Sequence, residues 1–234
     1  MDYFYSPPDH IVNNAVHIDG EEFAHLTHVM RKKEGDEICV VDGRGHAYDV
    51  RLITINKKQA EGVIIASRAG DHEPAISVTL AAGILKNPSK FDFLVEKTTE
   101  LGVKEIIPLT TDRTIPDHAK TDRWQKLALA AMKQSGRSYL PVVKDLQSLD
   151  DVLDGKNSFD LKLIAHEKEM QSPATAQLRE KAYRSVLILI GPEGGFSDEE
   201  VKQCMKAGCI PFYLGERRLR TETAAIVATA LTIR

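Results

Sequence analysis

The sequence predicts an α/β protein in which a small β-rich domain precedes a larger domain of alternating strands and helices. Strand-like runs separated by turn signals occupy residues 37–67. From residue 75 onward, apolar runs alternate with amphipathic segments. The later apolar runs are hydrophobic throughout, which is typical of parallel strands covered by helices on both faces.

The first domain, residues 1–70, is expected to be a small β-barrel or a curled sheet with one short helix. The helix is predicted over 21–31, ended by Gly35, because four apolar residues recur there at helical spacing: Phe23, Leu26, Val29 and Met30. Turn signals at 42–43 and 56–58 divide the strands that follow. Residues 67–74 are polar and aperiodic, and we expect them to form a linker.

The second domain, residues 74–234, is expected to hold a parallel sheet. Strands are predicted over 75–85, 104–109, 161–166, 186–190 and 210–214. Helices are predicted over 89–102, with Ser89 as N-cap and Gly102 at the end, and over 122–135. A further helix should begin near Ser197, which has the spacing of a capping box with Glu200. The last helix, "AAIVATALTI", is apolar on nearly every face, so it should be buried in the protein or in a dimer interface.

Composition fits a soluble globular protein, with 42% hydrophobic and 28% charged residues. The net charge of −3 means that any contact with nucleic acid must come from local basic clusters. No apolar run approaches the roughly 20 residues of a membrane span, and no secretion signal is predicted. Three cysteines without a CxxC pair favour a reducing cytoplasm. His25 and His28 lack a third ligand nearby, so no metal site is predicted.

Two glycine-containing loops follow strands where a parallel sheet binds ligands, beyond its carboxyl ends. The first, "IGPEGGFS", lacks the lysine of a phosphate-binding P-loop and the spacing of a dinucleotide fingerprint. Glu193 would repel a phosphate, so the loop suits a ligand that is uncharged or cationic where they meet. A tight turn without a ligand, with Glu193 as a solvated carboxylate, is the alternative. The second loop, "LGERRLRTETA", is rich in arginine.

These two loops resemble the signature loops of the SPOUT methyltransferases, in particular the ribosomal RNA small subunit methyltransferase E family. Three further stretches resemble that family in the same order along the chain: "HLTHVMRKKEGD", "VEKTTELGVKEIIPL" and "MKQSGRSYLP". The resemblance implies a PUA-like barrel followed by an α/β domain with a trefoil knot. It also implies S-adenosylmethionine as cofactor, a homodimer formed through the C-terminal domain, and methylation of N3 of a uridine in 16S ribosomal RNA of the small subunit.

The resemblance assigns residues to the cofactor and to the reaction. The cofactor is expected to contact Ile190, Gly191, Glu193, Gly194, Gly195, Leu214, Gly215, Leu219 and Thr223. The catalytic candidates are Arg217 and Arg220, whose guanidinium groups can pair with charge on a uridine carbonyl, and Glu222, as a base or as a group that orients them. A surface salt-bridge cluster is the alternative for these charged residues.

RNA contacts are expected in both domains. Arg31, Lys32 and Lys33, together with Lys57 and Lys58, predict a basic patch that contacts phosphates, or else a solvated charge run. Arg113, Gln134 and Arg137 lie in family-like stretches, although Lys133 stands where an acidic residue is expected. Three other functions stay open: methylation of a ribose 2′-OH or of tRNA, RNA binding without catalysis, and binding of a nucleotide phosphate.

Overall fold

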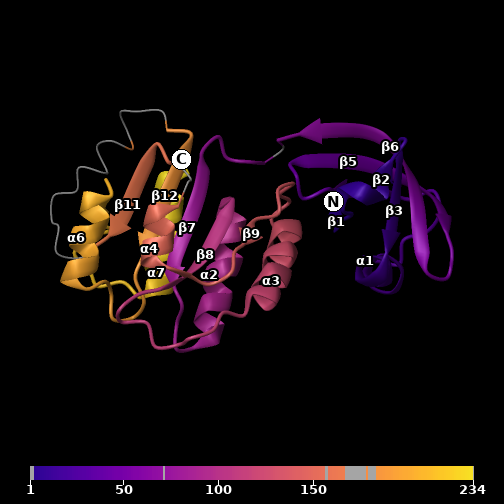
Figure 1. The fold of residues 1–234 in the computed structure, drawn as a ribbon. Coiled ribbons are helices and arrows are strands. Elements are labelled where there is room, and N and C mark those ends of the chain that lie inside the picture. Colours follow the sequence, from indigo (N-terminus) through magenta and orange to yellow (C-terminus); the bar gives the residue numbers. More distant parts are fainter. Residues whose placement is uncertain (1–2, 71, 156–157, 167–177, 179–182, 234) are drawn as a thin grey trace. The chain divides into compact units, whose positions relative to one another are not determined.

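A computed structural model describes residues 3–70, 72–155, 158–166, 178 and 183–233 (Figure 1). The chain divides into two compact units. The first unit comprises Met1–Glu73 and Leu129–Leu140, and the second comprises Pro74–Ala128 and Pro141–Arg234. The expected division at residues 70–74 did not anticipate that Leu129–Leu140 would belong to the first unit.

The first unit contains a six-stranded sheet around its own apolar core. The strand order is β1 (Tyr3–Tyr5), β4 (Glu37–Val41), β5 (His46–Ile55), β6 (Gln59–Ala69), β3 (Ala15–Asp19) and β2 (Ile11–Val12). Only the β1–β4 pairing is parallel among these described strands. A short 3₁₀ helix, η1 (Pro8–His10), precedes β2. The strands predicted within residues 37–67 are present, because alternation and turn residues specify antiparallel ribbons locally.

The helix predicted over 21–31 is wrong in its second half. α1 covers only Gly20–Ala24 and continues as a π-helix, η2 (His25–Val29). The amide of Met30 donates to the carbonyl of His25 over 3.0 Å, which inserts one residue into the turn. Val29 is therefore 66% exposed instead of lying on the core face. The segment ends at Arg31, which has a φ of 53°, rather than at Gly35.

The second unit contains a parallel sheet with helices packed on it. Its order is β10 (Gln147–Ser148), β8 (Glu105–Thr110), β7 (Ser77–Gly83), β12 (Ser185–Ile190), β11 (Leu161–Ala165) and β13 (Ile210–Phe212), and β9 (Val142–Val143) also pairs with β8. The helices are α2 (Pro88–Leu101), α4 (Leu149–Asp154), α6 (Asp198–Lys206) and α7 (Thr221–Thr232), and α3 (Thr121–Gln134) begins in this unit but belongs to the first from Leu129 onward. The five predicted strands are present, and β12 is buried at five of its six positions.

Helix ends follow capping chemistry. Ser197 and Glu200 form the predicted capping box of α6. The N-cap of α2 is Asn87, whose side chain accepts a hydrogen bond from the amide of Ser89, so the prediction of Ser89 as N-cap is wrong. Pro88 occupies the first helical position, where a missing amide hydrogen costs nothing. Gly102 ends α2 in the left-handed conformation, as predicted.

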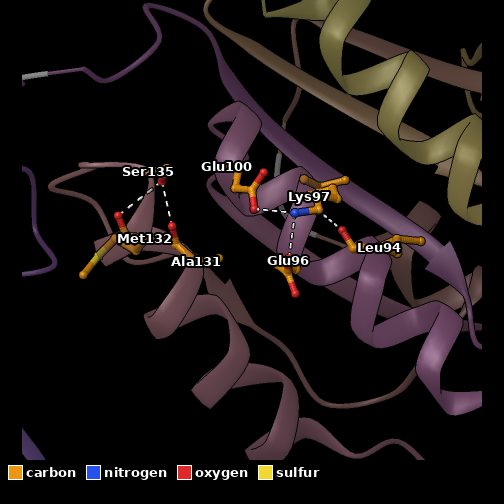
Figure 2. Close-up of polar contacts among 8 residues, drawn as sticks. Leu94, Glu96, Lys97, Glu100, Ala131, Met132 and Ser135 are labelled. Atoms are coloured by element: carbon orange, nitrogen blue, oxygen red, sulfur yellow. Dashed lines mark hydrogen bonds and ion pairs between the residues drawn. The ribbon is translucent and has the colours of Figure 1, made fainter. Parts of the chain in front are cut away.

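Side chains on the outer surface of α2 form polar contacts with one another (Figure 2). Nζ of Lys97 lies 2.8 Å from the carboxylate of Glu100 and 2.7 Å from that of Glu96. These two bonds raise the pKa of Lys97 above its ordinary value. The hydroxyl of Thr98, which is buried, donates to the carbonyl of Leu94 at 2.8 Å.

α7 follows β13 in the chain but packs on strands in the middle of the sheet. β13 is an edge strand, yet α7 packs against β7, β12 and α2. The chain after β13 must therefore return across the carboxyl ends of the strands before α7 begins. This return brings the second glycine loop back over the centre of the sheet.

One backbone crossing places the first glycine loop over β7. A Cβ atom built at Gly83, the last residue of β7, would lie 2.5 Å from the backbone nitrogen of Pro192. Real Cβ atoms do not approach backbone so closely. Glycine is therefore required at the end of β7.

We expect Gly83→Ala to lower the free energy of unfolding by about 1–3 kcal/mol, because the backbone at Pro192 must move. Gly208→Ala is the comparison variant, since Gly208 has a φ of 84° and no atom within 4 Å of an added Cβ. That variant should cost about 1 kcal/mol through backbone strain alone. Denaturant unfolding measures both, and a Gly83→Ala variant as stable as the parent would contradict the crossing.

Candidate functional site

A cavity of about 370 Å³ lies in the second unit, at the carboxyl ends of its central and edge strands. Residues 190–196, directly after β12, form one wall. Residues 212–215 and 217–222, from the end of β13 to the first turn of α7, form another. The rest of the lining comes from several elements: Lys90 of α2, Arg113, Ala165 at the end of β11, His166, Asp198 of α6 and Ala224 of α7. This is where an open parallel sheet binds ligands.

The first loop is a tight turn made possible by glycine. The amide of Gly195 donates to the carbonyl of Pro192 at 2.9 Å, and Gly195 has a φ of 67°. A Cβ at Gly191 would lie 2.9 Å from the backbone carbon of Gly195. The loop therefore brings bare backbone to the cavity, where a ligand can approach amide and carbonyl groups closely.

Two side chains fasten this loop to the rest of the second unit. Nη1 of Arg113 donates to the carbonyl of Gly194 at 2.7 Å. The carboxylate of Glu193 accepts a hydrogen bond from the amide of Lys86 at 3.2 Å. Glu193 thus tethers the loop to the segment after β7, which gives this turn carboxylate a structural purpose.

The second loop presents two unpaired guanidinium groups. Gly215 turns the chain with a φ of 115°, and Leu214 and Leu219 lie beside it in the lining. Arg217 and Arg220 are exposed and line the cavity. Neither forms an ion pair within the described part of the chain. A surface salt-bridge cluster, the alternative, therefore does not include Arg217 or Arg220 among the described residues.

Glu222 is the buried acid of the cavity. The residue is 8% exposed, and its Oε1 lies 3.9 Å from Nζ of Lys90. Its Oε2 is buried and has no hydrogen-bond partner among the described residues. A buried carboxylate oxygen without a donor is costly. Glu222 is therefore ready to accept a hydrogen bond from a ligand in the cavity.

Comparison with known proteins identifies the family. Residues 72–233 match the family described as "RNA methyltransferase domain", and residues 18–65 match "RNA methyltransferase PUA domain". The chain is 32% identical to the ribosomal RNA small subunit methyltransferase E of Bacillus subtilis, over 90% of this chain and 86% of that protein. It is 36% identical to the protein of the same name from Mesomycoplasma hyopneumoniae, over 86% and 87%.

The chain belongs to the ribosomal RNA small subunit methyltransferase E family.

Solved structures agree with this membership. The family protein of Neisseria gonorrhoeae, bound to S-adenosyl methionine, is 32% identical, with a TM-score of 0.87 over 98% of this chain and 95% of that one. A methyltransferase of Legionella pneumophila, in complex with the same cofactor, is 28% identical, with a TM-score of 0.86 over 99% and 96%. The fold is thus a PUA domain followed by an α/β methyltransferase domain, as the resemblance implied.

The structure brings most of the residues assigned by family resemblance into one cavity. All the expected cofactor residues line it except Thr223, which is exposed and lies outside the lining. Arg217, Arg220 and Glu222 line it as well. Sequence reasoning missed Lys90, Phe212 and Tyr213. No local sequence signal identifies Lys90, because its partner Glu222 is distant in sequence. Phe212 and Tyr213 could have been found, because they lie at the end of a predicted strand, next to the second glycine loop.

The residues expected to contact RNA are divided between the units. Arg31 and Lys33 are exposed, and Lys32 is half-buried, in the first unit. Gln134 is exposed at the end of α3, within the same unit. Arg113 belongs to the second unit, where it holds Gly194.

Arg137 does not fit the expected role. Its side chain is 2% exposed, and Nη2 lies 2.7 Å from Oε2 of Glu73. Oε1 of Glu73 also accepts the amides of Ser138 and Tyr139 at 3.0 and 2.9 Å. Arg137 is therefore a buried structural residue that joins Leu129–Leu140 to the rest of the first unit.

No group of three or more acidic, histidine or cysteine side chains suited to a metal ion occurs among the described residues. No helix in the described ranges is long and apolar enough to cross a membrane.

We expect Glu73→Gln to destabilise the protein by about 3–5 kcal/mol, because it leaves the buried Arg137 guanidinium without its counter-charge. Glu37→Gln is the control, since the Arg51–Glu37 pair is about half exposed on both sides and should contribute less than about 1 kcal/mol. Chemical unfolding measures the free energy of unfolding of both variants. Equal losses would show that the buried pair stabilises the protein no more than the exposed pair does.

We expect Arg113→Ala to weaken S-adenosylmethionine binding about tenfold, because Gly194 loses its charged hydrogen-bond donor and the loop loosens. Arg123→Ala removes an arginine of the same unit whose 2.7 Å pair with Asp92 lies away from the cavity lining. Calorimetry with S-adenosylmethionine should show unchanged affinity for this control. Unchanged affinity in both variants would mean that the Arg113 contact does not position the loop.

Proposed function

We propose that this chain transfers a methyl group from S-adenosylmethionine to N3 of one uridine in 16S ribosomal RNA of the small subunit. Membership of the family supports the reaction class, and the cavity supports the chemistry. The single observation that carries the proposal is the convergence of two glycine loops, two exposed arginines and one buried carboxylate on the same cavity.

The residues of the cavity suit this cofactor. S-adenosylmethionine supplies a methyl group bonded to a positively charged sulfonium and carries no phosphate. The loops offer backbone groups at Gly191, Gly195 and Gly215, and Phe212 and Leu214 offer apolar surface. Glu193 and Glu222 in the lining suit a ligand that is cationic at its reacting end.

Uridine N3 carries a proton that must leave for N3 to attack the methyl carbon. The Oε2 atom of Glu222 is buried and has no donor among the described residues, so it can take this proton. Nζ of Lys90, 3.9 Å from Oε1, stabilises the carboxylate. Arg217 or Arg220 can pair with negative charge that develops on a uridine carbonyl, since an arginine is a poor base and a good anion partner.

Three further features belong to this proposal. The return of the chain across the strand ends, from β13 to α7, is the path that a trefoil knot around the first loop requires.

The last helix offers apolar surface for a second copy of the chain. Three of its apolar residues are only partly buried, Ile226, Val227 and Leu231, and such surface supports a homodimer formed through the C-terminal domain. The described cysteines are free and buried, in keeping with a cytoplasmic protein.

The decisive experiment is mass analysis of small-subunit ribosomal RNA from a strain that lacks the gene. We expect one 3-methyluridine to be missing and to return when the gene is restored or when purified protein and S-adenosylmethionine are added. Loss of a ribose methyl group or of a tRNA modification instead would overturn the proposal. No lost modification, together with intact RNA binding, would indicate a protein without catalysis.

We expect Glu222→Gln to lower kcat by about 10²–10⁴-fold at saturating S-adenosylmethionine, since the glutamine cannot accept the N3 proton. Raising the pH should partly restore the rate, because the uridine ionises without help. Glu216→Gln is the matched control, an exposed residue of the same loop that lies outside the cavity lining. Equal rates for the two variants would exclude Glu222 as the proton acceptor.

A further inference from the structure

A second cavity, of about 580 Å³, lies within the first compact unit. Ligand sites for small molecules span roughly 300–1,000 Å³, so the cavity has room for one flat group. Its walls come from β1, from the helical segment after α1, from one residue after β6 and from the end of α3: Tyr3, His25, Met30, His72, Ala130, Lys133, Gln134, Ser135 and Gly136. The proposed methyl transfer uses none of these residues.

Two residues of this lining carry a polar group without a hydrogen-bond partner among the described residues. Nδ1 of His25 is buried and has no hydrogen-bond partner among the described residues, while its ring lies 5.7 Å from that of Phe4. Gln134 is exposed, and its amide makes no hydrogen bond within the described part of the chain. An amide is both donor and acceptor, so these groups can read the edge of a planar polar ligand.

The neighbouring hydroxyl, by contrast, is occupied. Oγ of Ser135 donates to the carbonyl of Ala131 at 2.7 Å and lies 3.2 Å from that of Met132 (Figure 2). The turn continues through Gly136, with a φ of 71°, and a Cβ there would lie 3.4 Å from the ring of Tyr3. These contacts hold the turn, while the exposed Gln134 amide makes no hydrogen bond to another described residue.

The charge of the cavity argues against a phosphate. Lys133 is paired with Glu22, and both side chains are about four-fifths buried. A phosphate would have to compete with this carboxylate. The rings of Tyr3 and His25 and the thioether of Met30 instead offer flat and apolar surface, on which aromatic groups stack.

The cavity borders an irregular segment that leads into the basic patch. His25–Val29 form the π-helix, a conformation often found at functional sites, and Met30 contributes to the lining. Arg31 follows in the left-handed conformation, and Arg31 and Lys33 are exposed. Phosphates bound by these side chains would place the attached nucleotide beside the cavity.

We propose that this second cavity binds one unstacked nucleobase of the RNA, distinct from the uridine that is methylated. Proteins read single-stranded RNA by stacking splayed bases on aromatic rings and by hydrogen-bonding their edges, and this cavity supplies both. The proposal depends on the proposed function, because the nucleobase belongs to the RNA substrate.

Short-wavelength ultraviolet cross-linking tests where bases contact the protein. The probe is small-subunit particles from a strain that lacks the gene, mixed with the full-length protein, followed by mass spectrometry of RNA-linked peptides. We expect links from one nucleotide, other than the methylated one, to peptides that contain Tyr3, His25–Met30 or Ala130–Gly136. Links confined to other peptides would overturn the proposal.

Substitutions test the polar contacts. We expect Gln134→Ala to weaken binding of the particles about tenfold, which is the usual effect of losing one contact with a base. The variant should also lose the cross-link. Gln134→Glu, which loses the donor but keeps the size, should behave similarly, as should His25→Phe, which keeps a ring beside Phe4. Gln59→Ala is the matched control, an exposed glutamine of the same unit outside the cavity. Equal binding by Gln134→Ala and Gln59→Ala would reject the contact.

Methylation by the parent protein separates the two proposals. A parent protein that methylates the particles but shows no cross-link in the cavity supports the proposed function and rejects the nucleobase site. Cross-links in the cavity without methylation would support the base contact and reject the proposed reaction. A parent protein that does not bind the particles would overturn both.

Discussion

The backbone crossing of Pro192 over Gly83 is the constraint on which the catalytic cavity depends. The crossing leaves no room for a side chain at the end of β7, and it sets the height of the first glycine loop above the sheet. Gly191 then lets the turn close on Gly195, and Arg113 and Glu193 fasten its two sides. Interiors are packed closely, so a side chain added at Gly83 would have to displace the loop at Pro192.

Solvation divides the charged residues of the cavity into two classes. Glu222 is buried, and one of its oxygens has no partner among the residues that the structure describes, whereas Arg217 and Arg220 are exposed to water. A buried carboxylate interacts strongly with whatever reaches it, because the local dielectric is low. Exposed guanidinium groups can move toward an incoming RNA at little cost. A proton acceptor benefits from the first environment, and a binding group for a mobile substrate from the second.

The first unit depends on a different device, a buried ion pair. Glu73 binds Arg137 and two backbone amides, and so joins the linker expected at 67–74 to residues after α3. Met132 adds an apolar contact to the cluster of Cys39, Val41 and Ala47. Leu129–Leu140, which lie within the methyltransferase match of the sequence, thus complete the β-rich first unit and supply one wall of its cavity.

The sequence by itself determined the strands within 37–67, five strands of the second unit, the capping box of α6 and the two glycine loops, because alternation, capping and turn chemistry act over a few residues. It also carried the family resemblance, which predicted a common site for residues 190–195 and 214–222. Only the tertiary structure decided the rest. The π-turn at His25 moved Val29 to the surface, the pair with Glu73 buried Arg137, and the return of α7 brought Glu222 to Lys90. Each depends on contacts between segments far apart in the chain, and no local period or spacing records such contacts.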